Sequence, residues 1–216
     1  MISVKLAIIA VAAYFLGCFQ PGSILCLRLF GGNIKTCGRT QRGYEAFVRN
    51  YGVKGCLAQF GPDVLKIILT VLMGGWILND PIDIVEVGRG MALFGLLLGT
   101  IFPCTRRFVG GRGVIEFLLG MIVVNSSAGI LSLFVFLVVT YFSKYTTWGI
   151  VGALFGGFLG IALFGDNPSS VILAAFCGVL VLFRHINHIL RIFNHKEQKL
   201  SKERDVSYKF DEDFKY

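Results

Sequence analysis

Residues 128–143 read AGILSLFVFLVVTYFS, and after the short link KYT residues 147–165 read TWGIVGALFGGFLGIALFG. Lys144 is the only charged side chain in this whole stretch. Each apolar run is close to the length of about 17–25 residues that a helix needs to cross the hydrocarbon core of a bilayer. The stretch therefore predicts two membrane-spanning helices joined by a short polar loop.

The same pattern continues on both sides of this pair. Apolar segments separated by short loops run roughly over residues 3–31, 55–79, 90–105, 113–126, 128–143, 147–165 and 168–188. The chain is 55% hydrophobic and 16% charged, whereas soluble domains have about 25% charged residues. These features predict an all-α integral membrane protein with about seven transmembrane helices, in which 113–126 is short enough for a half-helix. We expect one polytopic membrane domain over residues 1–194 and a polar cytoplasmic tail over residues 195–216.

Basic and acidic residues fall in alternate loops. The loops after residues 31, 105 and 143 and the tail hold most of the Lys and Arg side chains. The loops of the other side hold Asp80, Asp83, Glu86 and Asp166, with Arg89 as their basic residue. Because cytoplasmic loops carry an excess of Lys and Arg, we expect the N-terminus outside and the C-terminus in the cytoplasm. The net charge of +8 is concentrated in these loops, which suits anionic lipid or an anionic substrate and does not suit a nucleic-acid surface.

Small residues are frequent in the apolar segments. Twenty-seven glycines are present, and many lie where close helix packing needs them. None of the six cysteines forms a CxxC pair. We therefore predict no disulfide framework, no metal site and no cofactor, and interpret the cysteines as packing residues.

The stretch 106–114, RRFVGGRGV, combines glycines and arginines directly before an apolar helix. Gly110, Gly111 and Gly113 allow several N–H groups to turn toward one point, and the helix N-terminus and Arg112 add positive charge. The spacing is not that of a Walker loop, so nucleotide binding is not implied. We predict that Gly110, Gly111, Arg112 and Gly113 bind a phosphate group.

Ionisable residues also occur inside the apolar segments. Asp63 and Lys66 lie three residues apart and share a helix face, and Glu116 lies about one turn after Gly113. Such residues are costly at membrane depth and usually face the interior of a bundle. The Asp63–Lys66 pair fits a structural pair as well as a polar site. A carboxylate at Glu116 would repel a phosphate ligand unless an arginine covers it.

Two further basic stretches remain open to more than one interpretation. The loop 32–49 interleaves glycines with arginine forks that match phosphate oxygens, although orientation in the membrane alone explains a basic loop. The end of the last segment contains Arg184, His185, His188 and Arg191. Interfacial anchoring or anion contact explains that group better than metal binding, because the chain offers too few further ligands.

In their order along residues 10–200, these stretches resemble the bacterial acyl-phosphate-dependent glycerol-3-phosphate acyltransferases of the membrane. Residues 33–49 are similar to the family sequence Asp-Ile-Arg-x-x-Gly-Ser-Gly-Asn-x-Gly-Ala-Thr-Asn-x-x-Arg, and Asp63 with Lys66 matches its Asp-x-x-Lys. Residues 108–114 match Phe-x-Gly-Gly-Lys-Gly-Val, with Arg112 for Lys. Thr147 takes the place of a serine after a basic residue, and Arg184-His185 matches the closing Arg-His-x-x-Asn.

The resemblance implies that a fatty acyl group passes from acyl phosphate to glycerol 3-phosphate at a bacterial plasma membrane, giving lysophosphatidate without metal or cofactor. It implies catalytic candidates and substrate-binding residues. The catalytic candidates are Lys35, Gly38, Gln41, Thr147 and His185; the substrate-binding residues are Arg39, Arg42, Arg49, Asp63, Lys66, Arg184 and Asn187.

Departures from the family sequence fall on polar side chains that would face substrate. Arg39 stands for Ser, Glu45 for Thr, Ala46 for Asn and Thr100 for His. These changes predict slow or altered acyl transfer. The alternative is a membrane protein without catalysis that binds anionic lipid or lipid phosphate through the glycine loop.

Overall fold

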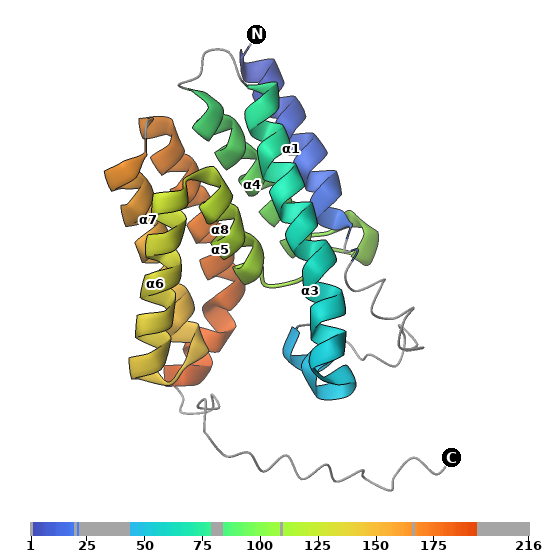
Figure 1. Ribbon diagram of the computed structural model, residues 1–216, viewed down its shortest axis with the longest axis vertical. Helices are drawn as coiled ribbons and strands as arrows, with labels where there is room; N and C mark the ends of the chain where they lie inside the picture. The colour runs from blue at the N-terminus through green and yellow to red at the C-terminus, as the bar shows by residue number, and fades with distance from the viewer. Residues whose placement is uncertain are drawn as a thin grey trace, which may run out of the picture.

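The computed structural model describes residues 2–19, 21, 44–78, 84–108, 110–165 and 167–193, except for the side chains of residues 44–56, 58, 59, 106, 187–189 and 191–193. Seven α-helices and one short 3₁₀ helix are complete within these ranges (Figure 1). They are α1 (Ile2–Cys18), α3 (Tyr44–Ile77), α4 (Val85–Ile101), η2 (Cys104–Arg106), α5 (Val114–Val124), α6 (Ser126–Ser143), α7 (Thr146–Phe164) and α8 (Pro168–Phe193). The described ranges contain no strand, so the all-α prediction is confirmed.

Each predicted apolar segment overlaps one of these helices. Four helical stretches are long and apolar enough to cross a membrane, namely Phe60–Ile77, Ser126–Ser143, Thr146–Phe164 and Pro168–Ile186. The helix α5 has 11 residues, which at about 1.5 Å per residue span roughly half of a hydrocarbon core about 30 Å thick. The expectation of a half-helix at this position is therefore confirmed.

Several helix boundaries differ from the sequence prediction: α3 begins at Tyr44 rather than at residue 55, and α8 ends at Phe193 rather than at residue 188. Two further differences have a local cause. The segment 3–31 was predicted as one apolar unit, but α1 ends at Cys18. The N–H of Phe19 donates to the carbonyl of Leu16 at 3.2 Å, which is a tighter bond than the α-helical one. Pro21 follows two residues later, and a proline disfavours helical conformation in the residue before it. Residues 22–43 lie outside the described residues.

The second difference concerns the start of α4. This helix begins at Val85 rather than at residue 90, so Glu86 and Arg89 belong to its first turns and not to an exposed loop. Glu86 is buried, and its carboxylate accepts a hydrogen bond from Asn125 Nδ2 at 3.0 Å. A carboxylate in the first turn of a helix is stabilised by the positive end of the helix dipole. This effect explains why Glu86 belongs to α4 and not to the preceding loop.

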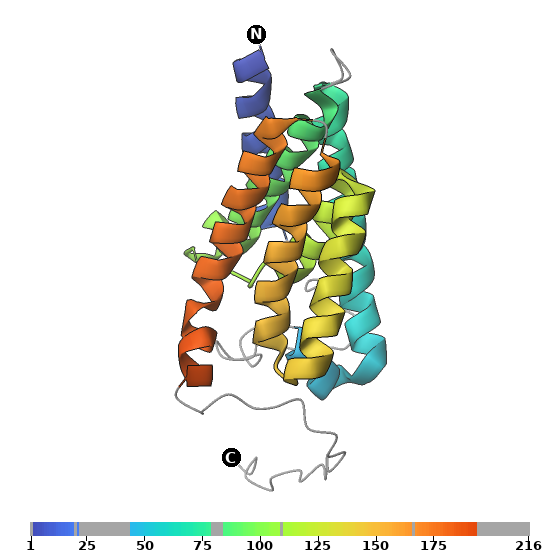
Figure 2. The same cartoon turned by 90° about the vertical axis from the view of Figure 1, so that its left-hand side faces the viewer.

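The helix α4 lies at the centre of the bundle and contacts α1, α3, α5 and α8 (Figures 1 and 2). Leu93, Leu96, Leu97 and Ile101 of this helix are almost fully buried in the main core. The most extensive helix contact is between α6 and α7, which is the pair predicted from residues 128–165. Successive helices run antiparallel (Figure 1). The C-terminal ends of α4, α6 and α8 therefore face the same side of the bundle.

Glycines bring the helices around α4 into backbone contact. A Cβ atom added to Gly17 of α1 would lie 2.9 Å from the Cα atom of Gly99 in α4. A Cβ atom added to Gly74 of α3 would lie 2.5 Å from the carbonyl oxygen of Gly88 in α4. The structure thus confirms that glycines of the apolar segments permit close helix packing.

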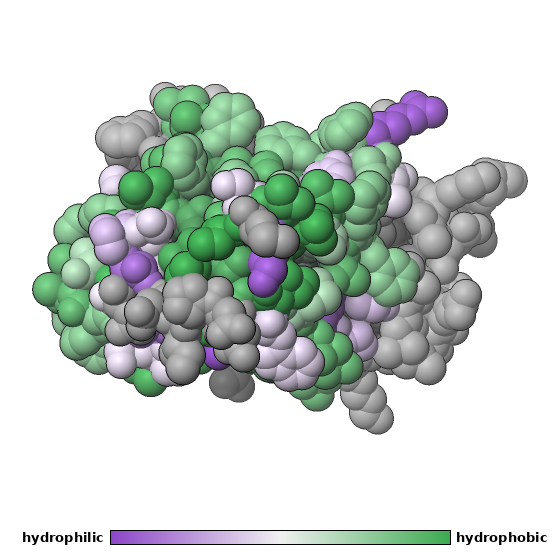
Figure 3. Space-filling view, turned by 90° about the horizontal axis from the view of Figure 1, so that it is seen from above, coloured by the Kyte–Doolittle hydropathy of each residue, from purple (hydrophilic) through white to green (hydrophobic). Residues whose placement is uncertain are grey.

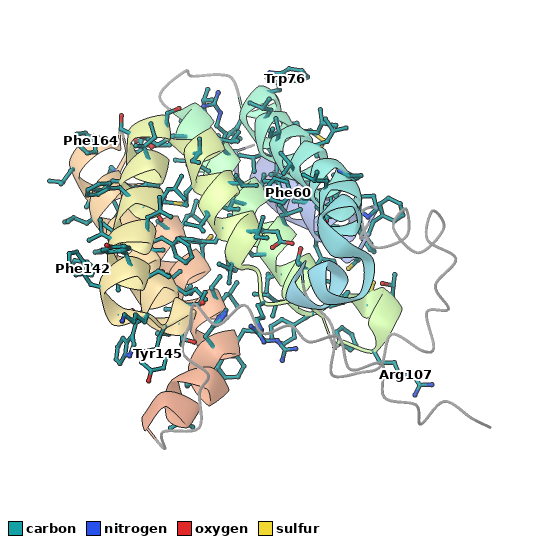
Figure 4. All side chains as sticks on the ribbon, turned by 60° about the horizontal axis from the view of Figure 1, so that its bottom comes forward. Phe60, Trp76, Arg107, Phe142, Tyr145 and Phe164 are labelled. Carbon is teal, nitrogen blue, oxygen red and sulfur yellow. The ribbon has the colours of Figure 1, made fainter. Side chains whose placement is uncertain are left out.

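The outer surface carries large apolar side chains. On α6, Phe134, Leu137, Tyr141 and Phe142 are all more than half exposed. Figure 3 looks down onto the end of the bundle and shows many hydrophobic side chains on the described surface, with hydrophilic residues among them. In Figure 4, Trp76, Phe142 and Phe164 project outward from their helices. Continuous apolar exposure of this extent is typical of a surface in contact with lipid.

The contact between the end of α1 and η2 provides a test of this packing. The Sγ atoms of Cys18 and Cys104 lie 3.6 Å apart, and both thiols are free. We expect diamide, which oxidises two thiols to one disulfide, to join these residues in membranes. Mass spectrometry of non-reduced peptides should detect the pair. The variant Cys104→Ser should lack the product, and absence of the pair from oxidised wild type would contradict the α1–η2 contact.

Candidate functional site

The chain folds back onto α4 directly after this helix ends. The N–H of Phe108 donates to the carbonyl of Pro103 at 3.0 Å. Arg107 and Phe108 both have left-handed backbone conformations, with φ angles of 53° and 59°, which are uncommon for residues with side chains. The side chain of Arg107 points away from the helices (Figure 4). This tight reversal carries the following residues back beneath the end of α4.

The glycines of the reversal cap α4. The N–H of Gly110 donates to the carbonyl of Ile101 at 3.2 Å, and the N–H of Gly111 donates to the carbonyl of Thr100 at 2.9 Å. The last carbonyls of a helix have no partner within the helix, and a buried helix end needs donors from elsewhere. The loop supplies those donors.

Arg184 of α8 holds the same loop from its other side. Its Nη2 atom donates to the carbonyl of Gly110 at 3.1 Å, and its Nε atom donates to the carbonyl of Gly111 at 3.3 Å. The planar guanidinium group is suited to binding two acceptors at once. Both sides of the Gly110–Gly111 segment are therefore fixed, one by α4 and the other by α8.

This arrangement corrects one detail of the predicted phosphate cradle. The N–H groups of Gly110 and Gly111 were expected to point toward a ligand, but both donate to α4. The donors that remain for a phosphate are the N–H groups in the first turn of α5. This helix begins directly after Gly113, which has a left-handed backbone conformation with a φ angle of 74°. Arg112 is exposed beside this turn. Phosphate binding by residues 110–113 stays a prediction. In the structure, the N–H donors available for it lie in α5 and not in the glycines.

A buried charged cluster lies between α3 and α5. Asp63, Lys66 and Glu116 are each at least nine-tenths buried. The Nζ atom of Lys66 donates to the carbonyl of Phe19 at 3.2 Å, just after the end of α1. Lys66 and Asp63 of α3 lie close enough to the buried Glu116 of α5 to interact with it electrostatically. The predicted pair Asp63 and Lys66 thus has a third member, which sequence spacing did not connect to it.

The remaining predicted residues are distributed as follows. His185 is buried in α8, with its Nδ1 atom 2.8 Å from the carbonyl of Val181. Thr147 is buried in the first turn of α7. Arg49 and Asn187 lie on α3 and α8, and their side chains are outside the described residues. Lys35, Gly38, Arg39, Gln41 and Arg42 also lie outside the described residues. The structure therefore brings together Arg184 with the glycine loop, and Lys66 with Glu116.

Nothing in the sequence indicated two further contacts between helices, of which one lies near this site. Tyr14 of α1 donates from its hydroxyl to the carbonyl of Phe102 at 3.0 Å. At the other side of the bundle, Asn125 Nδ2 also donates to the carbonyl of Phe164 at 2.9 Å. Both contacts end on backbone carbonyls, which carry no sequence signal of their own. The order of the resembling motifs gave the only hint that Arg184 and the glycine loop belong together.

The comparison with protein families decides the relationship. A family model described as "Glycerol-3-phosphate acyltransferase" matches residues 7–195. This chain belongs to that family. A glycerol-3-phosphate acyltransferase of Clostridioides difficile (strain 630) is 30% identical over 199 residues, which cover 92% of this chain and 97% of the relative. A namesake from Thermoanaerobacter pseudethanolicus is 24% identical over 197 residues, covering 91% of this chain and 96% of the relative.

Solved structures of this acyltransferase family share the fold. The glycerol 3-phosphate form of PlsY (YgiH), an integral membrane glycerol 3-phosphate acyltransferase, matches with a TM-score of 0.76 and 22% identity, over 91% of this chain and 96% of PlsY. Its lysophosphatidic acid form matches with a TM-score of 0.76 and 23% identity, over 90% of this chain and 94% of PlsY. The chain is thus a multi-pass membrane protein of the acyltransferase fold.

Proposed function

We propose that this protein is a glycerol-3-phosphate acyltransferase that uses a fatty acyl phosphate as donor and releases lysophosphatidate and inorganic phosphate. Family membership over nearly the whole chain supports the acyltransferase activity. The observation that carries the site is the glycine loop, which is fixed by α4 and Arg184 directly before the N-terminus of α5. The plasma membrane of a bacterium is the proposed location.

The chemistry asks mainly for positioning. An acyl phosphate is an activated mixed anhydride, so an oxygen of the acceptor attacks the acyl carbonyl carbon and forms the new ester bond. The bond from that carbon to the phosphate oxygen breaks, and the hydroxyl proton goes to the leaving phosphate. The protein must hold the two anionic substrates with the acceptor hydroxyl beside the acyl carbonyl, and it must stabilise the oxyanion that forms. Arg112 and the N–H groups of the first turn of α5, which have no partner within the helix, suit this task.

The direct test follows phosphate release from purified protein given acyl phosphate and glycerol 3-phosphate. We expect release that depends on both substrates, at a lower rate than that of the Clostridioides difficile relative measured in parallel, because the first loop departs from the family sequence. Binding of lysophosphatidate without any turnover by well-folded protein would contradict the proposed activity. That outcome would favour the alternative of a lipid-binding membrane protein.

We expect Arg112→Ala to lower the apparent affinity for the phosphate-bearing substrates roughly ten- to a hundredfold. Loss of a charge-assisted hydrogen bond costs about 1.5–3 kcal/mol, and about 1.4 kcal/mol corresponds to tenfold. The measurement is the KM for each substrate in the phosphate-release assay. Arg107→Ala is the matched control, since Arg107 points away from the helices (Figure 4). Unchanged KM values in Arg112→Ala would make this arginine a membrane-orienting charge only.

The proposed orientation places the N-terminus outside and the polar tail 195–216, which follows the membrane domain 1–194, in the cytoplasm. Arg107, Arg112 and Lys144 support it, because they follow α4 and α6, whose ends face one side of the bundle. We expect an impermeant thiol reagent added to intact cells to modify Asn167→Cys and to spare Arg107→Cys. Mass spectrometry locates the modified peptides, and lysed cells give the full-labelling control. Labelling of Arg107→Cys from outside would reverse the orientation.

A further inference from the structure

Two free thiols meet where the end of α1 contacts η2. The Sγ atoms of Cys18 and Cys104 lie 3.6 Å apart. Cys18 is 5% exposed, whereas Cys104 is an exposed residue at the start of η2. The hydroxyl of Thr105 donates to the carbonyl of Cys18 at 3.3 Å, which ties the two segments together. A buried thiol therefore faces an exposed one across a contact between two separate parts of the chain.

The Cys18 side of this contact is held firmly by α4. A Cβ atom added to Gly99 of α4 would lie 2.9 Å from the backbone nitrogen of Cys18 and would collide with the carbonyl oxygen of Tyr14. The backbones of α1 and α4 are thus in direct contact at Cys18. The hydroxyl of Tyr14 also donates to the carbonyl of Phe102 at 3.0 Å. Because α1 cannot shift without losing this packing, a backbone movement that brings the two thiols together must occur in η2.

Cys104 is joined directly to the residues that hold the glycine loop. Pro103 precedes it, is buried, and accepts the hydrogen bond from the N–H of Phe108 at 3.0 Å. A Cβ atom added to Gly110 would lie 2.5 Å from Pro103 Cδ, so the glycine loop packs on this proline. A displacement of η2 is therefore passed through Pro103 to Gly110.

A disulfide holds its sulfur atoms about 2.05 Å apart, so this pair must close by about 1.5 Å to form one. We propose that Cys18 and Cys104 are a redox modification site, at which a small-molecule disulfide such as oxidised glutathione converts both thiols to one disulfide and thereby lowers acyl transfer. The inference rests on the proposed function, because the glycine loop that moves belongs to the proposed site. In the proposed orientation the pair lies on the cytoplasmic side, where disulfides are usually transient.

The exposure of the two thiols sets the order of the reaction. Arg107 points away from the helices just after η2 (Figure 4), and a cation is costly in hydrocarbon, so a water-soluble oxidant reaches Cys104 first. The Cys104 thiolate attacks one sulfur of oxidised glutathione and releases one glutathione. The Cys18 thiolate then attacks the Cys104 Sγ atom of this mixed disulfide and releases the second. The two protein thiols lose two protons and two electrons, and the two glutathiones gain them.

The expected effect on turnover follows from the displacement. A shift of about 1 Å in a positioned group lowers rates about a hundredfold. Rotation of the two cysteine side chains closes part of the gap, so the loop moves by less than the full amount. We expect the disulfide to lower kcat at least about tenfold and dithiothreitol to restore it.

The experiment compares reduced and glutathione-oxidised protein purified in detergent. Phosphate release from acyl phosphate and glycerol 3-phosphate gives kcat, and mass spectrometry of non-reduced peptides identifies the disulfide. The proteins are wild type, Cys18→Ser, Cys104→Ser, and a control that combines Cys26→Ser, Cys37→Ser and Cys56→Ser and keeps the pair. A second readout needs no turnover. Hydrogen exchange of peptides that cover residues 110 and 111 reports on the N–H groups that cap α4.

Oxidised wild type and the triple variant should both lose at least about tenfold in kcat, with faster exchange at residues 110 and 111. Cys18→Ser should stop at the mixed disulfide on Cys104, and Cys104→Ser should form neither product and keep its activity. Failure of wild type to form the disulfide would overturn the proposal. So would a disulfide that leaves kcat unchanged, or an equal loss of activity in Cys104→Ser. Reduced wild type without acyl transfer, but with faster exchange on oxidation, would instead reject the proposed function alone.

Discussion

Arg184→Ala is expected to lower kcat/KM roughly a hundredfold or more. The guanidinium group donates to the carbonyls of Gly110 and Gly111, and a hydrogen bond to a charged group contributes about 1.5–3 kcal/mol. Loss of two such bonds leaves two partly buried carbonyls without a donor and releases the loop from α8. Since about 1.4 kcal/mol is a factor of ten, even the lower values give this loss. Phosphate release measures it.

Conservative replacement separates the loop contact from the charge of Arg184. Arg184→Lys keeps the charge but presents one compact ammonium group in place of a planar fork, so it should recover only part of the activity. The loss should appear mainly in kcat, because Arg184 acts by positioning the loop. Arg107→Ala should retain full activity. If Arg184→Lys and Arg184→Ala both remain within threefold of wild type, the contact between α8 and the loop has no role in turnover.

Gly110→Ala is expected to lower kcat/KM about a hundredfold and to lower the melting temperature as well. A Cβ atom at this position would collide with the carbonyl oxygen of Thr100 and lie 2.5 Å from Pro103 Cδ. The loop would have to move away from α4, which breaks the bond from the Gly110 N–H to Ile101. Overpacking of this kind costs about 1–3 kcal/mol, and a displacement of about 1 Å in a positioned group lowers rates about a hundredfold.

The neighbouring glycine is the control for this prediction. A Cβ atom at Gly111 would meet Thr100 Cγ2 at 3.5 Å, which is an ordinary van der Waals contact. Gly111→Ala should therefore keep the wild-type melting temperature. If it loses activity at an unchanged melting temperature, a ligand occupies the space next to Gly111. Equal thermal destabilisation by both substitutions would show that the loop does not pack on α4 as described.

The sequence was sufficient for the helices and insufficient for the contacts between them. Apolar runs of membrane length identify α6 and α7 because spanning helices must satisfy their own backbone groups. Helix ends were less predictable: Pro21 ends α1 early, and Glu86 enters α4 because a first turn favours a carboxylate. The capping of α4 by Gly110 and Gly111 depends on carbonyls, which every residue has. The meeting of Lys66 with Glu116 requires α3 and α5 to be packed first.

The hydrogen bonds from Arg184 to the glycine loop also determine an order of events during synthesis. Gly110 and Arg184 are separated by 74 residues, so the loop emerges from the ribosome well before the side chain that holds it. At about 5–20 residues per second, synthesis of the intervening chain takes roughly 4–15 seconds. During this interval the nascent chain has α4 and the glycines that cap it, but it lacks Arg184 of α8, which holds the loop in place. A protein truncated before Arg184 should therefore enter the membrane and remain inactive, which confines catalysis to completed chains.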